Sequence, residues 1–143
     1  MNPYDALKLE GQLCFPLYAC SREIIKRYKP FLDELDLTYT QYVAMLVLWE
    51  QKSLTSKELG RRLYLDSGTL TPLLKKMEKK GLLTRCRSDM DERNLLVTIT
   101  EEGMALREQA LHIPYELAKC VELEAEEAKT LHHLLRKLLD SAK

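Results

Sequence analysis

The sequence of 143 residues has little glycine and proline, five of each, and it lacks a long apolar run. Its longest apolar stretch, residues 42–49, is far shorter than the roughly 20 residues that a membrane-spanning helix needs. The first residues, MNPYDALKLEGQ, lack the basic and then apolar pattern of a secretory signal. We therefore expect a cytoplasmic protein of one domain, in a compartment that keeps thiols reduced.

The chain also has no net charge, because its 22 Lys and Arg residues balance its 22 Asp and Glu residues. The charges are nevertheless unevenly placed. Residues 75–87 carry six basic side chains against Glu78, a local charge of +5, and residues 116–127 carry five glutamates against Lys119, a local charge of −4. A basic middle and an acidic C-terminal part suggest separate roles, with nucleic acid as a possible partner of the first.

Metal-ligand spacing is missing too. The four cysteines show no C-x-x-C or Cys/His pattern, and His132 and His133 are adjacent, so that they diverge on a helix. We expect no metal and no cofactor. The stretch QLCFPLYAC (residues 12–20) holds two of the cysteines, and it leaves open metal ligands, a disulfide, buried packing residues or one reactive thiol beside an inert one.

Leucine and alanine are abundant and β-branched runs are short, which favours a mostly α-helical fold. The first helix is predicted to end at Lys29-Pro30. Thr38 to Gln41 and Thr55 to Glu58 have the capping-box pattern, and Ser67 is a plausible N-cap. Pro114 is expected to kink the long helix that starts at Thr100. From N to C, the predicted helices cover residues 13–28, 38–49, 55–63, 67–80, about 100–121, and a last segment through Leu131–Leu139.

Two runs resemble strands, residues 82–87 and 95–100, and the polar segment SDMDERN joins them. A helix–turn–helix followed by a two-stranded hairpin is the layout of a winged helix-turn-helix. The flanking helices carry longer apolar stripes than a small domain needs for its own core. These stripes predict a dimer that is built from the N- and C-terminal helices.

Helix geometry separates the two cysteines of QLCFPLYAC. Six residues apart, Cys14 and Cys20 lie about 240° apart around the axis and ~9 Å apart along it. They therefore cannot form a disulfide with each other. Cys20 is predicted to be a buried packing residue, and Cys86 to be passive. Cys14 differs, because unpaired N–H groups and the dipole at a helix start favour a thiolate.

Three segments resemble the MarR family, and more narrowly its branch of organic-hydroperoxide-sensing (OhrR-like) repressors: LCFPLYACSREIIKRYKPFLDELDLTYTQY, LYLDSGTLTPLLKKMEKKGLLTR and DERNLLVTITEEG. The resemblance covers roughly residues 10 to 115. It implies a single MarR-type domain, residues 1–143, that forms a homodimer on pseudo-palindromic double-stranded DNA. Dimerisation helices would cover about 1–30 and 104–143, and the winged helix-turn-helix about 38–100.

The resemblance also implies a sensor. The family's N-terminal redox-active cysteine corresponds to Cys14, and its two supporting tyrosines correspond to Tyr28 and Tyr39. Some relatives carry a second cysteine that forms a disulfide with the sensor of the other subunit, and Cys120 falls at about that position. Pro16 departs from the family pattern, and we expect it to bend or restart the helix beside Cys14.

The expected DNA contacts lie on the second helix of the motif and on the hairpin. Small hydroxyl residues near a helix N-terminus suit base edges and phosphates, and lysines neutralise phosphates. The resemblance places an arginine of the turn in the minor groove, oriented by an aspartate. Three or four neutralised phosphates per subunit would make binding fall with roughly the sixth or seventh power of salt concentration. The candidate DNA-binding residues are Ser67, Thr69, Thr71, Lys75, Lys76, Arg85, Arg87, Asp91 and Arg93.

Together these features predict a transcriptional repressor, not an enzyme, that leaves its operator when organic hydroperoxide, the inducer, oxidises Cys14. Apolar neighbours such as Phe15 and Leu17 suit organic peroxides better than hydrogen peroxide. Three alternatives remain at this stage. They are a MarR-type regulator with a non-covalent ligand, a thiol peroxidase, and a winged-helix module that contacts only protein.

Overall fold

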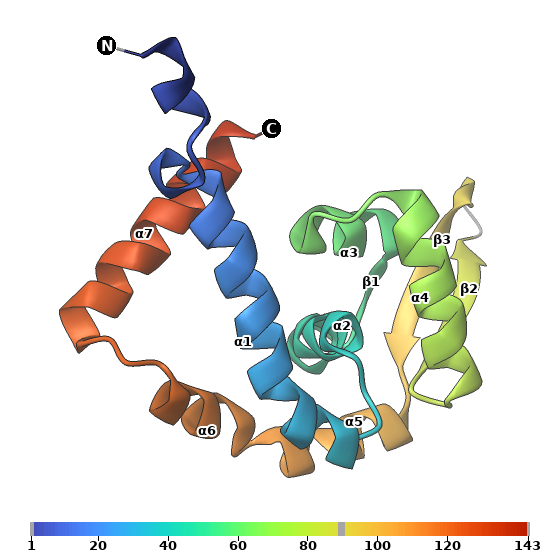
Figure 1. The fold of residues 1–143 in the computed structure, drawn as a ribbon. Coiled ribbons are helices and arrows are strands. Elements are labelled where there is room, and N and C mark those ends of the chain that lie inside the picture. Colours follow the sequence, from blue (N-terminus) through green and yellow to red (C-terminus); the bar gives the residue numbers. More distant parts are fainter. Residues whose placement is uncertain (1, 89–90, 143) are drawn as a thin grey trace. The chain divides into compact units, whose positions relative to one another are not determined.

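A computed structural model describes residues 2–88 and 91–142, although the side chains of residues 88 and 91–94 are outside the described part. The chain divides into two units, residues 1–113 and 114–143, each of which is described by itself. Figure 1 shows the order of the elements. Two short 3₁₀ helices come first, η1 (Pro3–Leu7) and η2 (Leu9–Gly11). They are followed by α1 (Cys14–Glu34), α2 (Tyr39–Gln51), β1 (Ser53–Thr55), α3 (Ser56–Leu63), α4 (Ser67–Lys79), β2 (Leu83–Ser88), β3 (Asp91–Ile99) and α5 (Glu101–Ala110). Then follow α6 (Ile113–Cys120) and α7 (Ala125–Ser141).

The helix α1 is longer than the sequence predicts, and Pro30 lies inside it instead of ending it. Proline in a helix removes the hydrogen bond of its own N–H and its ring clashes with the carbonyl of the preceding turn, but burial of Leu32 holds the next turn against the core. Pro16 also behaves differently from expectation. Because α1 starts at Cys14, Pro16 lies in the first turn, where backbone N–H groups have no helical partner, so that the helix is not interrupted there.

The capping box predicted for α2 is confirmed. The Thr38 hydroxyl accepts a hydrogen bond from the Gln41 N–H, and the Gln41 side chain accepts one from the Thr38 N–H. Ala44, Met45 and Leu48 are fully buried, and α2 is therefore the central helix of the core.

The helix-turn-helix consists of α3 and α4. Thr55 caps α3 as predicted, accepting from the Glu58 N–H. The N-cap of α4 is Asp66 and not Ser67, which is already the first helical residue. Between the helices Tyr64 adopts a left-handed conformation (φ 57°). The turn passes so close to α3 that a Cβ at Gly60 would lie 2.9 Å from the Leu65 carbonyl oxygen, which explains a glycine at this point of the helix.

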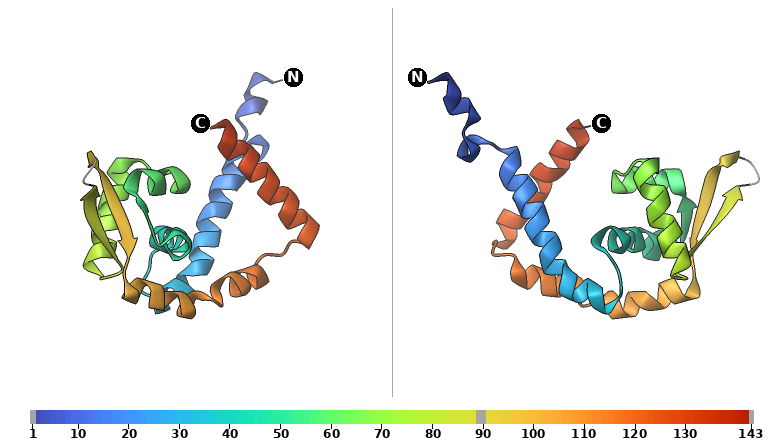
Figure 2. Two further views of the ribbon diagram at one scale, coloured as in Figure 1. Left: turned by 180° about the vertical axis from the view of Figure 1, so that it is seen from behind. Right: turned by 45° about the vertical axis from the view of Figure 1, so that its right-hand side comes forward.

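The wing is a three-stranded antiparallel sheet in the order β1-β3-β2, and its first strand was not predicted from the sequence. In its register Leu54 lies opposite Val97, and Arg85 lies opposite Val97 on the other side. The strand β3 also begins earlier than expected, at Asp91. The sheet packs against α4, which runs alongside β2 and β3 in both views of Figure 2.

The predicted long helix after Thr100 is two helices. Thr100 caps α5 as expected, but α5 ends at Ala110 and α6 begins at Ile113. Pro114 therefore occupies the second position of a new helix, where its missing N–H costs nothing, instead of kinking a continuous one. Among the described residues, no helix is long and apolar enough to cross a membrane.

Candidate nucleic-acid interface and thiol sensor

One face of α4 is polar and fully exposed. Leu70, Leu74 and Met77 are buried, as the sequence pattern predicts, and Leu73 is half-buried. The side chains opposite them are exposed: Ser67, Thr69, Thr71, Lys75 and Lys76. At the start of this face, hydrogen bonds from Thr69 hold the pKa of Asp66 below its ordinary value. Asp66 thus remains an ionised cap at neutral pH and fixes the first turn of the helix.

An ion pair joins α4 to the wing. Glu78 accepts hydrogen bonds from the Arg85 backbone N–H at 3.0 Å and from the Arg85 guanidinium at 3.1 and 3.3 Å. Because of the Arg85 bonds, the pKa of Glu78 lies below its ordinary value. Arg85 is half-buried, whereas Arg87 is exposed further along the same strand. Of the predicted wing contacts, Arg85 is therefore already engaged within the chain.

The remaining two predicted wing contacts, Asp91 and Arg93, have their backbone in β3. Their side chains lie outside the described residues, so that the expected minor-groove contact has no described geometry.

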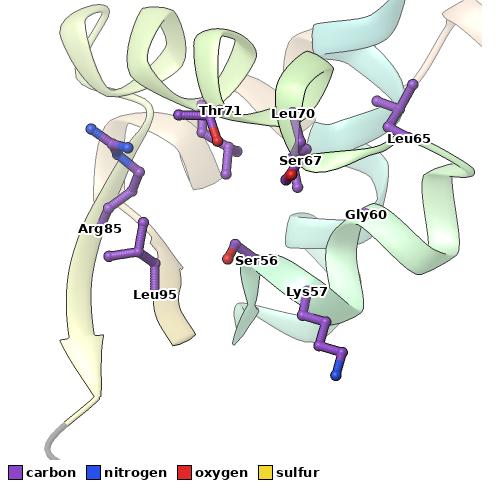
Figure 3. A pocket seen from close by; sticks show the side chains of 10 residues that line it. Ser56, Lys57, Gly60, Leu65, Ser67, Leu70, Thr71, Arg85 and Leu95 are labelled. Carbon is purple, nitrogen blue, oxygen red and sulfur yellow. The ribbon is translucent and has the colours of Figure 1, made fainter. Parts of the chain in front are cut away.

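A cleft of about 480 Å³ lies between the helix-turn-helix and the wing (Figure 3). Side chains from α3, α4, β2 and β3 line it: Ser56, Lys57, Gly60, Leu65, Ser67, Leu70, Thr71, Leu74, Arg85 and Leu95. In Figure 3 the Ser67 and Leu70 side chains point from α4 toward α3, and Lys57 extends away from the cleft. Ser56 and Lys57 were not predicted as site residues, although the N-cap Thr55 marks the helix end where they lie.

The thiols are the second candidate site. All four cysteines are exposed, and none of them is in a disulfide within the chain. The expectation that Cys20 is buried is therefore wrong, because α1 turns most of its first half to the surface, where Cys14 and Cys20 are both exposed. Cys14 is the first residue of α1, the position that favours an anion. In the residues that the structure describes, no group of three or more His, Cys, Asp or Glu is arranged to hold a metal.

The two predicted sensor-supporting tyrosines are in contact, with their rings tilted by 54° to one another. The Tyr28 and Tyr39 ring centroids are 4.9 Å apart, and Tyr42 lies 5.7 Å from Tyr28. Burial raises the pKa of Tyr28 and of Tyr39, and it raises the pKa of Tyr42 to about 12. All three phenols are therefore neutral hydrogen-bond donors at physiological pH.

The tyrosine cluster lies far from the thiol of its own chain. Cys14 and Tyr28 are separated by fourteen positions of one helix, α1, which corresponds to about 21 Å at 1.5 Å per residue. A hydrogen bond reaches about 3 Å. The Tyr28 phenol therefore cannot bond the Cys14 sulfur of the same chain.

Alkaline titration tests this cluster. A tyrosine whose folded pKa is raised favours folding fully below its unfolded pKa near 10, and this contribution is lost as the pH rises through the folded value. We expect stability against urea to fall between about pH 10 and 12. The phenolate absorbance of three of the seven tyrosines should appear later than that of the rest. A single titration step near pH 10 would contradict the described burial.

Cys120 is the last residue of α6, in the second unit. It is exposed, and its thiol donates a hydrogen bond to the Glu116 carbonyl at 3.5 Å. Further apolar side chains are exposed on α1 and on α7, in numbers that a monomer rarely shows. They are Phe15, Leu17, Tyr18, Ile24 and Ile25 on α1, and Leu131, Leu134, Leu138 and Leu139 on α7.

A three-stranded wing packed against a helix-turn-helix defines a winged-helix DNA-binding protein, and known proteins agree. Residues 26–110 match the family of SarA/Rot transcriptional regulators. The organic hydroperoxide resistance transcriptional regulator of Bacillus subtilis is 52% identical over 98% of this chain and 95% of its own length. The chain belongs to the MarR family of transcriptional regulators, in its organic-hydroperoxide (OhrR-like) branch, and is not an enzyme.

Solved structures show the same fold. Reduced AbfR bound to DNA, a protein of Staphylococcus epidermidis, is 33% identical and covers 96% of this chain and 94% of its own, with a TM-score of 0.81. Overoxidised AbfR bound to DNA is 32% identical and covers 99% of this chain and 100% of its own, with a TM-score of 0.79. The predicted fold class, a mostly helical winged helix-turn-helix, is therefore confirmed.

Proposed function

We propose that the chain is a homodimeric repressor that holds a pseudo-palindromic operator while Cys14 is reduced and releases it when organic hydroperoxide oxidises Cys14. The observation that carries this proposal is an exposed thiol at a helix start, on a chain whose recognition helix presents a hydroxyl-rich and basic face. As a transcriptional regulator of this bacterial family, it would act in the cytoplasm, where the DNA is.

The dimer is supported by the apolar side chains that α1 and α7 expose, because their burial against a second copy is favourable. Residues of about 1–30 and 104–143 would dimerise, leaving about 38–100 to bind DNA. The distance along α1 gives the dimer a chemical role as well. Tyr28 and Tyr39 of one subunit would donate to the thiolate of Cys14 in the other, favouring its charged form.

The DNA complex would place α4 in the major groove. Ser67, Thr69 and Thr71 would contact base edges and phosphates near the helix start. Lys75 and Lys76 would neutralise phosphates. On the wing, Arg87 and Arg93 would approach the backbone and the minor groove, with Asp91 orienting Arg93 and with Arg85 holding the wing to α4.

The redox step is a two-electron transfer. The Cys14 thiolate attacks the terminal oxygen of the hydroperoxide, the O–O bond breaks, and the leaving alkoxide takes up a proton from water to become the alcohol, so that Cys14 becomes a sulfenic acid. A second thiol then displaces water and forms a disulfide. Cys120 of the partner subunit is one candidate for that thiol, and a small cellular thiol is the other. AbfR exists in an overoxidised form bound to DNA, which supports disulfide formation and not overoxidation as the releasing event.

A second candidate function is a regulator that responds to a non-covalent ligand. A cleft of about 270 Å³ favours it, with an apolar lining that includes Ile25, Leu32 and Leu37 beside Tyr39. In that case peroxide would not be the inducer, and the state of Cys14 would not matter for DNA binding.

The test uses a duplex selected from a random-sequence library by the reduced wild-type protein. Cumene hydroperoxide should release this duplex in gel shifts, and dithiothreitol should restore binding. Non-reducing electrophoresis of the wild type and of Cys120→Ser identifies the second thiol. A covalent dimer that is lost only in the variant supports Cys120, and its absence in the wild type supports a small thiol. Unchanged binding of wild type after oxidation would contradict the proposal.

A further inference from the structure

The residue that ends α4 makes contacts that link the tyrosine cluster to the DNA-binding elements. Lys80 is the C-cap of α4. Its ammonium group donates to the Asp36 backbone carbonyl and, at 3.1 Å, to the Gln41 side-chain oxygen, and it lies 3.7 Å from the Asp36 carboxylate. Two of these acceptors belong to Asp36, in the connection between α1 and α2, and the third to Gln41, in the first turn of α2, 39 or more positions away in the sequence.

The acceptor side is unusually constrained. Asp36 has φ 55°, a left-handed conformation that a non-glycine residue adopts at a cost. Gln41 is buried, and its side-chain oxygen also accepts the Thr38 N–H at 3.1 Å in the capping box. Because Asp36 and Gln41 have few other conformations available, we expect a displacement of these acceptors to move Lys80 as well. Lys80 is thus bonded to a turn that has one well-defined arrangement.

That turn is also the support of Tyr39. Tyr39 lies between Thr38 and Gln41 in the chain, as the first residue of α2, and its ring contacts that of Tyr28, with the centroids 4.9 Å apart. A change in the hydrogen bonding of these phenols therefore acts on the same turn that Lys80 holds.

On its other side Lys80 adjoins both DNA-binding elements. It ends α4, and Gly81 (φ 81°) and Leu82 lead directly into β2. The Thr100 hydroxyl donates to the Gly81 carbonyl at 2.6 Å, and this bond fixes the base of the wing. A shift of the Lys80 ammonium would consequently move the end of the recognition helix and the start of the wing together.

We propose that Lys80 is a positioning residue that couples the state of the tyrosine cluster to the placement of α4 and the wing. This inference rests on the redox function proposed above, and it assigns to Lys80 and Gln41 a part in the release of DNA that is separate from sensing. Lys80 touches neither the thiol nor, in this role, the bases. It would transmit the response because its ammonium group bonds the buried Gln41 side chain and the backbone carbonyl of Asp36, whereas the Asp36 carboxylate is itself exposed.

The test compares Lys80→Met with Lys79→Met, using the duplex selected by the reduced wild-type protein. Both substitutions remove one positive charge from the same helix end, but Lys79 is exposed and has no described partner. The measured quantity is the ratio of dissociation constants for that duplex after and before cumene hydroperoxide. Allosteric coupling typically changes affinity 5- to 150-fold, and Lys80→Met is expected to reduce the wild-type ratio by about tenfold. Lys79→Met should leave it unchanged, and Lys80→Arg should largely preserve it.

Two further readouts separate coupling from simple structural damage. The rate at which peroxide consumes the Cys14 thiol should be the same in all variants, because none of them touches the sensor. In a double-mutant cycle, Lys80→Met and Gln41→Met should not have additive effects on the ratio, since they break the same bond.

An unchanged ratio in Lys80→Met, including one accompanied by weaker reduced-state binding or lower stability, would overturn the inference and leave Lys80 with only a structural role. Slower thiol oxidation would also overturn it, by placing Lys80 in sensing. If the wild-type protein itself keeps its duplex after oxidation, the redox function fails first, and the coupling role falls with it.

Discussion

A Cys14→Ser protein is expected to bind the selected duplex as tightly as the reduced wild type and to remain bound after cumene hydroperoxide. Serine is nearly isosteric with cysteine, but its hydroxyl is not oxidised by a peroxide, and no sulfenic acid or disulfide can form. The wild type should lose affinity by roughly one to two orders of magnitude under the same treatment. Titration by gel shift, before and after peroxide and again after dithiothreitol, measures both values.

The matched control is Cys20→Ser. Cys20 is also exposed and lies on the same helix, six positions on, so that general oxidation of α1 would affect both thiols. We expect Cys20→Ser to respond to peroxide like the wild type. If peroxide releases DNA from Cys14→Ser, the sensor is another cysteine. If DNA is released without any loss of thiol, the result favours a regulator that responds to a non-covalent ligand.

The second large effect is expected from Lys75→Ala/Lys76→Ala. Both lysines are exposed on α4, and in a dimer the double substitution removes four positive charges from the DNA face. Each lost phosphate contact reduces the slope of log affinity against log salt concentration by about 0.9. The slope should therefore fall by about 3.6 and the affinity by a factor of roughly 100 to 1,000 at moderate salt.

Lys129→Ala/Lys137→Ala is the control for net charge. It removes the same charge from exposed positions of α7, in the other unit. Its salt slope should stay close to that of the wild type. Equal slopes for both double variants would show that α4 does not lie along the phosphates, and that overall charge alone governs binding.

Local signals in the sequence predicted much of the fold. The N-caps Thr38 and Thr55 were predicted correctly, because their hydrogen bonds join residues only three positions apart, and so was the buried apolar stripe of α4. The capping box predicted at Thr55 forms only in part, because the Glu58 carboxylate pairs with Arg61. The strand β1 was missed because three residues have no detectable alternation, and only pairing with β3 makes them a strand. Ser67 was mistaken for the cap because Asp66, beside it, is an equally good N-cap residue.

The candidate sites were harder to predict, since they depend on contacts distant in sequence. Nothing in the hairpin pattern indicates that Arg85 is bonded to Glu78. Cys20 was expected to be buried because its helix is apolar, but that apolar surface is exposed in the single chain. The distance between Cys14 and Tyr28 can be calculated from helix geometry, but only because the structure shows one continuous helix between them.

The bond between Glu78 and Arg85 bears on how operators of this regulator can evolve. It joins α4 to β2 through both the backbone and the guanidinium of Arg85. The helix and the wing would therefore contact DNA at a fixed distance from one another. One inserted base pair would displace the sequence beneath the wing by about 3.4 Å and rotate it around the duplex. Under the proposed docking, new target promoters would therefore arise by base substitution, whereas insertions and deletions within a half-site would abolish recognition.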